Sequence, residues 1–491
     1  MKRSQIIAKS LTSHVPHMAH SKPEPKNTTR IMAKEPTTMN LAFSNRIGEA
    51  ALLAVLAMST NMVAQQQEQS KNSPPSRYIL RDLGTLPGGA FSQAAGVTGY
   101  GLVSGVSTVS DGTQHAALWF EGHKFDIGTP GLGGANTAGF GINIWAEVAG
   151  QGETSTTDPN NENFCAYGTG MKCQPFRWQD GKTTRLSLLG GNNGTVGNIN
   201  NHGDVSGVAE TGRRDPACPA AVAVNGTGPQ FLDFEAVIWN GGQKAARELR
   251  PLAGDTVGEA FWINDNGLAV GTTGLCSNTQ LPPFAAGAHA VLWDNYGTPH
   301  DLGNLGGTAN PAIRGIGNIA FAINNRSHVV GASALAGDAN DEAFLWTKET
   351  GMVPLGRLDG DTNSAGLSIN NKDEIVGGSV NGDLLTGDAH PFLWSNGVMT
   401  PLSSLLPLDT DLIPLIANAI NDDGEITGFG FQPSSQEIHA FLAVPCSRTS
   451  TEKQWCNGDH NGYSSRPIGA DKPKAALSED ARRLLQRLGH R

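Results

Sequence analysis

The stretch His289-Ala-Val-Leu-Trp293 is a short apolar run that opens with a polar residue and ends in tryptophan. Six other stretches share this pattern, although the last ends in alanine: residues 115–119, 174–178, 235–239, 342–346, 390–394 and 439–443. Successive tryptophans lie 59, 61, 54, 53 and 48 residues apart. An element that returns about every 50 residues indicates an array of structural repeats.

Two further markers accompany each tryptophan stretch. An Ile-Asn pair precedes it, as at 263–264 and 420–421, and asparagine and glycine there allow a tight turn between strands. A Leu-Gly strand and a Gly-Gly bend follow it, as at 301–307. The unit therefore has four short strands, which end in Ile-Asn, Val-x-Gly, Leu-Trp and Leu-Gly. Four antiparallel strands in about 50 residues are typical of a β-propeller blade.

The two ends of the array complement each other. The seventh copy stops at residues 441–444 and lacks a fourth strand, whereas residues 78–84 are a fourth strand without a preceding blade. Pairing these two segments would close the ring and leave no exposed strand edge. We therefore predict an all-β, seven-bladed propeller over residues 78–445, closed by its N-terminal strand. An open β-solenoid is the alternative, and it would need terminal caps.

The repeated motif resembles a known family. His-Ala-Phe at 439–441 and Asp-Leu-Gly-Thr-Leu-Pro-Gly-Gly at 82–89 are similar to the HAF-repeat family of bacterial extracellular proteins. The resemblance covers about residues 78–445, and the first two copies depart from it most. It implies export and a repeat architecture, and it implies no particular activity.

Composition excludes one broad class of function. The chain has 491 residues, a net charge of -10 and 62 glycines. A nucleic-acid-binding protein needs a basic stripe that displaces counterions, and none is present in this sequence. The glycines lie between short apolar runs, as expected for many hairpins.

The segments outside the repeats predict export. Residues 48–58 are apolar, follow Arg46, and resemble a signal peptide with cleavage after Ala64. We assign residues 1–64 to this signal, whose long leading region favours a true start at Met32 or Met39, and 65–77 to a linker. An uncleaved membrane anchor is the alternative. We assign residues 446–491 to a C-terminal tail without the repeat. Residues 477–488 of this tail are expected to form either a short amphipathic helix or a frayed end.

The cysteine pattern also fits an oxidising compartment, either extracellular or periplasmic. The chain has six cysteines and no Cys-x-x-Cys spacing. Cys165 with Cys173, and Cys446 with Cys456, would close short loops. Cys218 and Cys276 occupy equivalent loops of adjacent repeats, so a disulfide could join them.

One face of the propeller is the expected binding face. The loops between second and third strands vary greatly in length, and segments 151–173 and 208–234 are long insertions. Variable insertions on one face of a repeat array are typical of a ligand-binding surface. We expect the channel itself to be lined mainly by small residues.

Two sets of candidate ligand residues lie on this face. The first opens each third strand and could form a ring of ligands or simply tie loops together: His115, Gln174, Glu235, His289, Glu342, His390 and His439. The second could offer oxygen atoms to Ca²⁺, although no EF-hand spacing is present: Asp338, Asp341, Asp383 and Asp388. No other cofactor is expected.

The sequence contains no Gly-x-Ser-x-Gly elbow, His-Glu-x-x-His helix or phosphate-binding loop. We therefore favour a monomeric binding or interaction module for a protein or glycan. A propeller hydrolase or lyase acting on polysaccharide, and a structural component of the cell envelope, are the alternatives. Clustered acids or histidines at the channel mouth would favour the enzyme, and an apolar or aromatic patch would favour binding.

Overall fold

The computed structural model describes residues 77–216, 218, 228, 230–276, 288–308, 317–382, 387–407, 409–448 and 456. All of them belong to the second of two units into which the chain divides, Pro75–Arg491. The signal peptide predicted at 1–64, nearly all of the linker and the helix predicted at 477–488 lie outside the described residues. Among the described residues, no helix has the length and apolar character needed to span a membrane.

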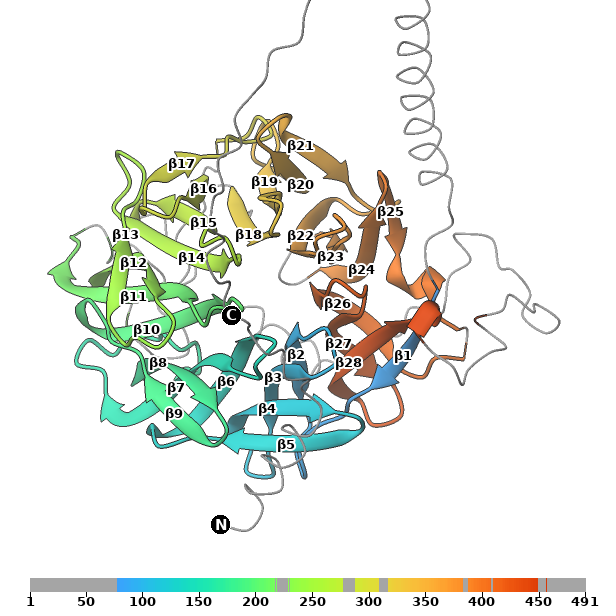
Figure 1. Cartoon of the computed structure of the whole chain (residues 1–491), viewed down its shortest axis with the longest axis horizontal. Coiled ribbons are helices and arrows are strands. Elements are labelled where there is room, and N and C mark those ends of the chain that lie inside the picture. The colour runs from blue at the N-terminus through green and yellow to red at the C-terminus, as the bar shows by residue number, and fades with distance from the viewer. Residues whose placement is uncertain are drawn as a thin grey trace, which may run out of the picture. The chain divides into compact units, whose positions relative to one another are not determined.

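Seven four-stranded antiparallel sheets surround a common centre, so the predicted seven-bladed propeller is confirmed (Figure 1). From the innermost strand outwards, blade 1 consists of β2 (Ser92–Val97), β3 (Val103–Thr108), β4 (Gln114–Phe120) and β5 (His123–Gly128). Blade 2 consists of β6 (Gly133–Ile142), β7 (Val148–Thr157), β8 (Met171–Gln179) and β9 (Lys182–Arg185). Blade 3 consists of β10 (Gly190–Ile199), β11 (Val205–Arg214), β12 (Leu232–Trp239) and β13 (Ala246–Leu249).

The remaining four blades repeat this order. Blade 4 consists of β14 (Val257–Ile263), β15 (Ala269–Gly274), β16 (His289–Trp293) and β17 (Pro299–Asp301), and blade 5 of β18 (Ile319–Ile323), β19 (Val329–Ala334), β20 (Asp341–Thr347) and β21 (Gly351–Gly356). Blade 6 consists of β22 (Asn363–Ile369), β23 (Ile375–Asn381), β24 (Asp388–Ser395) and β25 (Val398–Pro401). Blade 7 consists of β26 (Ile413–Ile420), β27 (Ile426–Gln432), β28 (Glu437–Pro445) and β1 (Tyr78–Asp82). The described residues also include two short 3-10 helices, η3 (Leu402–Leu405) and η4 (Cys446–Arg448).

The N-terminal strand completes the last blade. β1 pairs with β28 in an antiparallel register that sets Tyr78 opposite Pro445 and Asp82 opposite Phe441. Blade 7 also meets blade 1, because the backbone N–H of Ala440 donates to Ser92 Oγ at 2.8 Å. The ring is therefore closed in the predicted way, and the open solenoid is wrong.

The tryptophans of the repeat pack in the apolar layers of the ring. Trp119, Trp239 and Trp293 are at most 1% exposed. The indole N–H of Trp239 donates to the carbonyl of Ser187, which lies between blades 2 and 3, at 2.8 Å. Trp293 makes the equivalent contact with the carbonyl of Arg250 at 2.8 Å. In these two blades a large buried ring therefore also has its one polar atom hydrogen-bonded to the crossover between blades, whereas the indole nitrogen of Trp119 has no hydrogen-bond partner among the described residues.

The glycine of each Val-x-Gly strand makes room for an irregularity in its neighbour. Every innermost strand contains a β-bulge or register shift beside this glycine. In blade 4 the shift falls between Ala260 and Trp262, and Gly271 pairs with Ala260. A Cβ atom on Gly271 would lie 1.9 Å from the carbonyl oxygen of Glu259. Only glycine tolerates this approach, and the bulge re-aims the side chains that follow it.

In six of the seven blades, an asparagine after the innermost strand joins its blade to the next. Asn264 Oδ1 accepts the backbone N–H groups of Asn266 and Leu268, which closes the turn. Its Nδ2 donates to the carbonyl of the equivalent asparagine in blade 5. This donation recurs at 2.9–3.1 Å around the ring from Asn143 through Asn200, Asn264, Asn324, Asn370 and Asn421 to Thr98. The Ile-Asn marker is therefore also the link between blades.

Candidate functional site: the central channel

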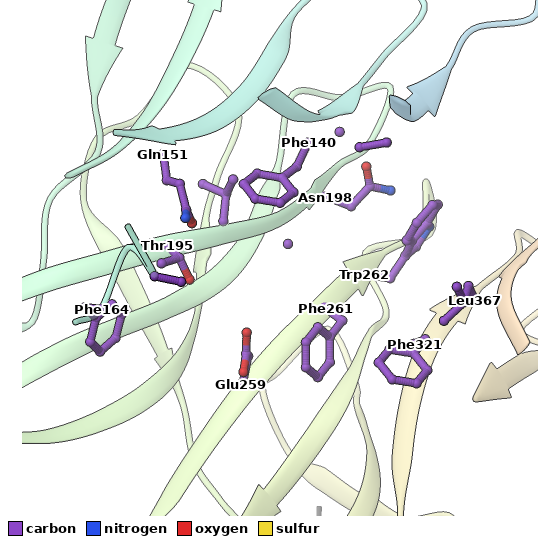
Figure 2. A pocket seen from close by; sticks show the side chains of 15 residues that line it. Phe140, Gln151, Phe164, Thr195, Asn198, Glu259, Phe261, Trp262, Phe321 and Leu367 are labelled. Atoms are coloured by element: carbon purple, nitrogen blue, oxygen red, sulfur yellow. The ribbon is translucent and has the colours of Figure 1, made fainter. Parts of the chain in front are cut away.

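A cavity of about 240 Å³ occupies the channel. The innermost strands of blades 1 to 6 contribute to its wall, and two further sides come from β7 and the loop after it. Figure 2 shows side chains that line this cavity and labels ten of them: Phe140, Gln151, Phe164, Thr195, Asn198, Glu259, Phe261, Trp262, Phe321 and Leu367. The cavity therefore lies where the blades converge, at the insertion-bearing face.

Aromatic side chains form much of this wall. Phe261 and Phe321, from adjacent blades 4 and 5, lie with ring centroids 5.4 Å apart. Because of the β-bulge in β14, the consecutive residues Phe261 and Trp262 both line the cavity, whereas regular alternation would turn one of them away. Our expectation that small residues mainly line the channel is wrong at these positions and at Phe140.

The first long insertion closes one side of the cavity. Its Phe164 and Ala166 are lining residues, and Phe164 also packs edge-to-face on Phe234 of blade 3 at 6.2 Å between centroids. The disulfide between Cys165 and Cys173 ties this loop to β8. The two insertions contact each other as well, since a short β-bridge joins residues 162 and 228.

All three predicted disulfide pairs form. Besides Cys165–Cys173, Cys218 bonds to Cys276 and Cys446 bonds to Cys456. The bond between Cys218 and Cys276 joins the loops of blades 3 and 4, and both cysteines are buried with Phe164 and Phe234. The insertion-bearing face over blades 2 to 4 is therefore a cross-linked, apolar-cored layer.

The polar side of the cavity carries amide, hydroxyl and carboxyl groups. Gln151, Thr195, Asn198 and Glu259 line it, and Glu259 is 6% exposed. Gln151 Nε2 also donates to the carbonyl of Cys165, at 3.4 Å. Ring faces and hydrogen-bonding groups therefore share one small space, as in many ligand sites.

The ring of polar residues predicted at the third strands lies outside this cavity. None of its seven members is among the fifteen lining residues of the described chain. Each of its four histidines instead contacts an aspartate at 2.8–3.0 Å: His115 with Asp126, His289 with Asp255, His390 with Asp361 and His439 with Asp82. A ligand role for these residues stays a prediction.

The other three members have different neighbours. Glu235 Oε1 lies 3.6 Å from Arg213, and burial together with Asp233 and Glu248 raises the pKa of Glu235 to about 8. Glu342 pairs with Arg357 at 3.3 Å. The side-chain amide of Gln174 donates to the carbonyl of Leu186 at 2.7 Å.

Three of the four aspartates suggested for Ca²⁺ are described, and they are spread over blades 5 and 6. Asp338 and Asp341 lie in and after the loop that precedes β20, and the backbone N–H of Thr308 donates to Asp338 Oδ1 at 2.6 Å. Asp388 opens β24, and Asp383 lies outside the described residues. Their calcium binding stays a prediction.

Sequence reasoning missed the aromatic wall for a physical reason. Phe140, Phe261 and Phe321 each lie two residues before the isoleucine of an Ile-Asn marker, so their blades and strands were evident. The side that each residue faces depends on the bulge, and a hydrophobicity pattern does not reveal a bulge. The glycine of the neighbouring Val-x-Gly strand was the available signal.

Comparisons with known proteins assign no family. No protein-family model matches the chain, and no curated protein matches it significantly. A solved Mycobacterium tuberculosis puromycin-hydrolyzing peptidase is 10% identical, with a TM-score of 0.39 and coverage of 76% of this chain and 55% of that one. A Porphyromonas gingivalis dipeptidyl peptidase 4 is 9% identical, with a TM-score of 0.31 and coverage of 67% and 51%. This chain thus spans about half of either peptidase.

A lectin of Aleuria aurantia is also similar. It is 8% identical, with a TM-score of 0.28, and the match covers 77% of this chain and all of the lectin. At these identities and TM-scores, none of the three structures assigns an activity or a ligand to this chain. The functional argument therefore rests on the cavity itself.

Proposed function

We propose that this chain is an exported binding protein that takes up a ligand in its channel cavity through the insertion-bearing face. The observation that carries this proposal is the lining of the cavity, which combines Phe261, Trp262 and Phe321 with the polar groups of Gln151 and Asn198. Aromatic faces suit the apolar faces of a ring-shaped ligand, and amides suit its hydroxyl groups. A sugar unit of a glycan has this combination.

The cavity favours binding over hydrolysis of polysaccharide. Glycosidases position two carboxyl groups on either side of the scissile bond. Among the fifteen described lining residues, Glu259 is the one carboxylic acid. A carbohydrate held there would meet a single acidic group.

Export and family membership belong to the same proposal. Three disulfides support an oxidising compartment, either extracellular or periplasmic. The recurring His-Ala-Phe-type strands support membership of the HAF-repeat family. A ring in which β1 completes the last blade supports a monomer.

The binding proposal is tested by titrating the purified chain with neutral oligosaccharides and following heat and tryptophan fluorescence. We expect saturable binding that Phe261→Ala weakens by about tenfold or more, because truncating a central aromatic contact removes much of the binding energy. Tyr296→Ala is the matched control, since Tyr296 is 91% exposed and outside the cavity lining. Equal affinity of the native chain and Phe261→Ala would refute the proposal, and release of reducing ends would favour the enzyme.

A further inference from the structure

Three carboxyl groups meet in the interior between blades 2 and 3. Asp158 and Glu162 belong to the insertion that follows β7, and Glu210 lies on β11. The three side chains are 2%, 0% and 0% exposed. One oxygen atom from each lies within 4.8 Å of the other two.

The hydrogen bonds of Glu210 fit its ionised form. Its Oε2 accepts the backbone N–H groups of Asn192 and Asn193 at 3.0 and 2.9 Å, and Asn193 Nδ2 at 3.0 Å. Its Oε1 accepts Gln230 Nε2 at 2.9 Å. All of these partners are donors, which suits a carboxylate, because an ionised carboxyl group only accepts hydrogen bonds.

The two carboxyl groups of the insertion are also surrounded by donors. Glu162 Oε1 accepts the backbone N–H groups of Phe231 and Leu232 at 2.6 and 3.0 Å. Asp158 Oδ1 accepts the N–H of Asn160 at 2.8 Å and that of Glu162 at 3.2 Å. The contacts with residues 231 and 232 join the two long insertions, so this cluster holds the loop that carries Phe164.

Electrostatics oppose three bare charges in this place. All three side chains are buried and one oxygen atom of each lies within 4.8 Å of the other two, so three ionised carboxylates would repel each other strongly. No lysine or arginine among the described residues forms an ion pair with any of the three carboxylates. The hydrogen bonds suit ionised groups, while burial disfavours ionised groups unless a cation is present.

An independent feature points to the same space. The side chain of Gln230 is 1% exposed, and its amide nitrogen donates to Glu210 Oε1 at 2.9 Å and to the carbonyl of Leu232 at 2.9 Å, which places the amide group beside the cluster. Its oxygen atom Oε1 is buried and receives no hydrogen bond from any described residue. A buried carbonyl oxygen without a donor is costly, and a metal ion would satisfy it.

We propose that Asp158, Glu162 and Glu210 bind one divalent cation, with the amide oxygen of Gln230 as a further ligand, and that this cation is Ca²⁺. All four groups offer oxygen, which Ca²⁺ prefers, whereas Zn²⁺ favours nitrogen and sulfur ligands. Mg²⁺ demands strict octahedral geometry and keeps several waters, which suits a fully buried cluster less well than it suits an exposed one. The ion holds the first insertion on blade 3 and so fixes one side of the channel cavity.

The experiment uses the whole disulfide-bonded chain after removal of metal with a chelator. Calcium chloride is titrated calorimetrically, and thermal unfolding is recorded with and without it. We expect one saturable site and a rise in Tm with Ca²⁺, with a clearly smaller effect of Mg²⁺ at the same concentration. Absence of both heat and Tm shift in the native chain would overturn the proposal. Neither measurement involves a sugar ligand, so the calcium proposal is tested separately from the proposed function.

Glu210→Gln removes one charge and keeps the size of the side chain. We expect it to weaken Ca²⁺ binding by at least about tenfold. Glu425→Gln is the matched control, because Glu425 is buried and hydrogen-bonded to Asn421 in blade 7, away from the cluster. Native-like affinity in Glu210→Gln would contradict the assignment. If that variant does not fold, the titration of the native chain with Ca²⁺ and Mg²⁺ still decides the question.

Discussion

At the scale of single residues, the glycine of the Val-x-Gly strand controls the shape of the channel wall. We expect Gly271→Ala to lower the free energy of unfolding by about 1–3 kcal/mol, because the added Cβ would lie 1.9 Å from the carbonyl oxygen of Glu259. Chemical denaturation measures this loss. Gly99→Ala is the control, since its Cβ would lie 3.8 Å from the nearest atom, a carboxylate oxygen of Asp423. Equal stability of the two variants would contradict the role of Gly271.

Other residues differ in how far the sequence predicts them. The burial of Trp119, Trp239 and Trp293 follows from their recurrence at the end of an apolar strand. The channel-facing position of Trp262 does not, because it results from a bulge. The carboxyl cluster was missed for another reason. Asp158 and Glu210 are 52 residues apart in the sequence and meet only when the insertion folds across two blades.

At the scale of elements, the turn after each innermost strand is a repeated joint with one incomplete copy. Thr98 in blade 1 replaces the asparagine, and its Oγ1 accepts the N–H of Leu102 at 3.1 Å. Because threonine lacks an amide donor, the donation from blade 1 to the carbonyl of Asn143 is missing from the otherwise repeated series. We expect Thr98→Asn to raise the free energy of unfolding by about 0.5–1.5 kcal/mol, the usual net contribution of one hydrogen bond.

A variant that removes the same hydrogen bonds in another blade provides the control for this joint. Asn264→Ala removes two accepted hydrogen bonds and the donation to Asn324, and it leaves buried backbone groups without partners. Thermal unfolding should therefore move in opposite directions for the two variants. A decrease in Tm for Thr98→Asn would mean that blade 1 does not accept the joint of the other blades.

The strands themselves are predictable from their spacing, and the insertions are not. Four strand endings recur in each repeat, so the positions of Ile263, Gly271 and Trp293 are enough to place β14, β15 and β16. The insertion at 151–173 carries no repeat. Its position over the cavity depends on Phe164, the disulfide of Cys165 and the buried acids, which act together only in three dimensions.

At the scale of the whole molecule, the two ends of the array predicted closure, and a pair of charged residues lies at that closure. His439 on β28 contacts Asp82 on β1 at 2.9 Å and Glu437 at 3.1 Å. Burial disfavours both charged forms. The hydrogen bonds and attraction outweigh it, so the pKa of His439 is raised above 6.5 and that of Asp82 is lowered below 3.8.

These shifts give the closed ring a pH dependence with a defined sign. The contribution of His439 is complete below its unfolded value of 6.5 and is lost as the pH rises through its raised folded value. The contribution of Asp82 is present above its unfolded value of 3.8 and is lost as the pH falls through its lowered folded value. The pair therefore stabilises closure most between these two unfolded values.

We expect His439→Gln to reduce Tm at about pH 5.5 by a few degrees and to flatten the decline of Tm between about pH 6 and 8. Glutamine retains a donor for Asp82 but does not titrate. His300→Gln is the matched control, because His300 pairs with Asp294 at 3.4 Å within one exposed hairpin and makes no contact with β1. If His439→Gln kept the native pH profile, the ion pair would contribute nothing measurable to closure, which would then depend on the remaining contacts, among them the backbone pairing of β1 and the apolar contacts of Tyr78.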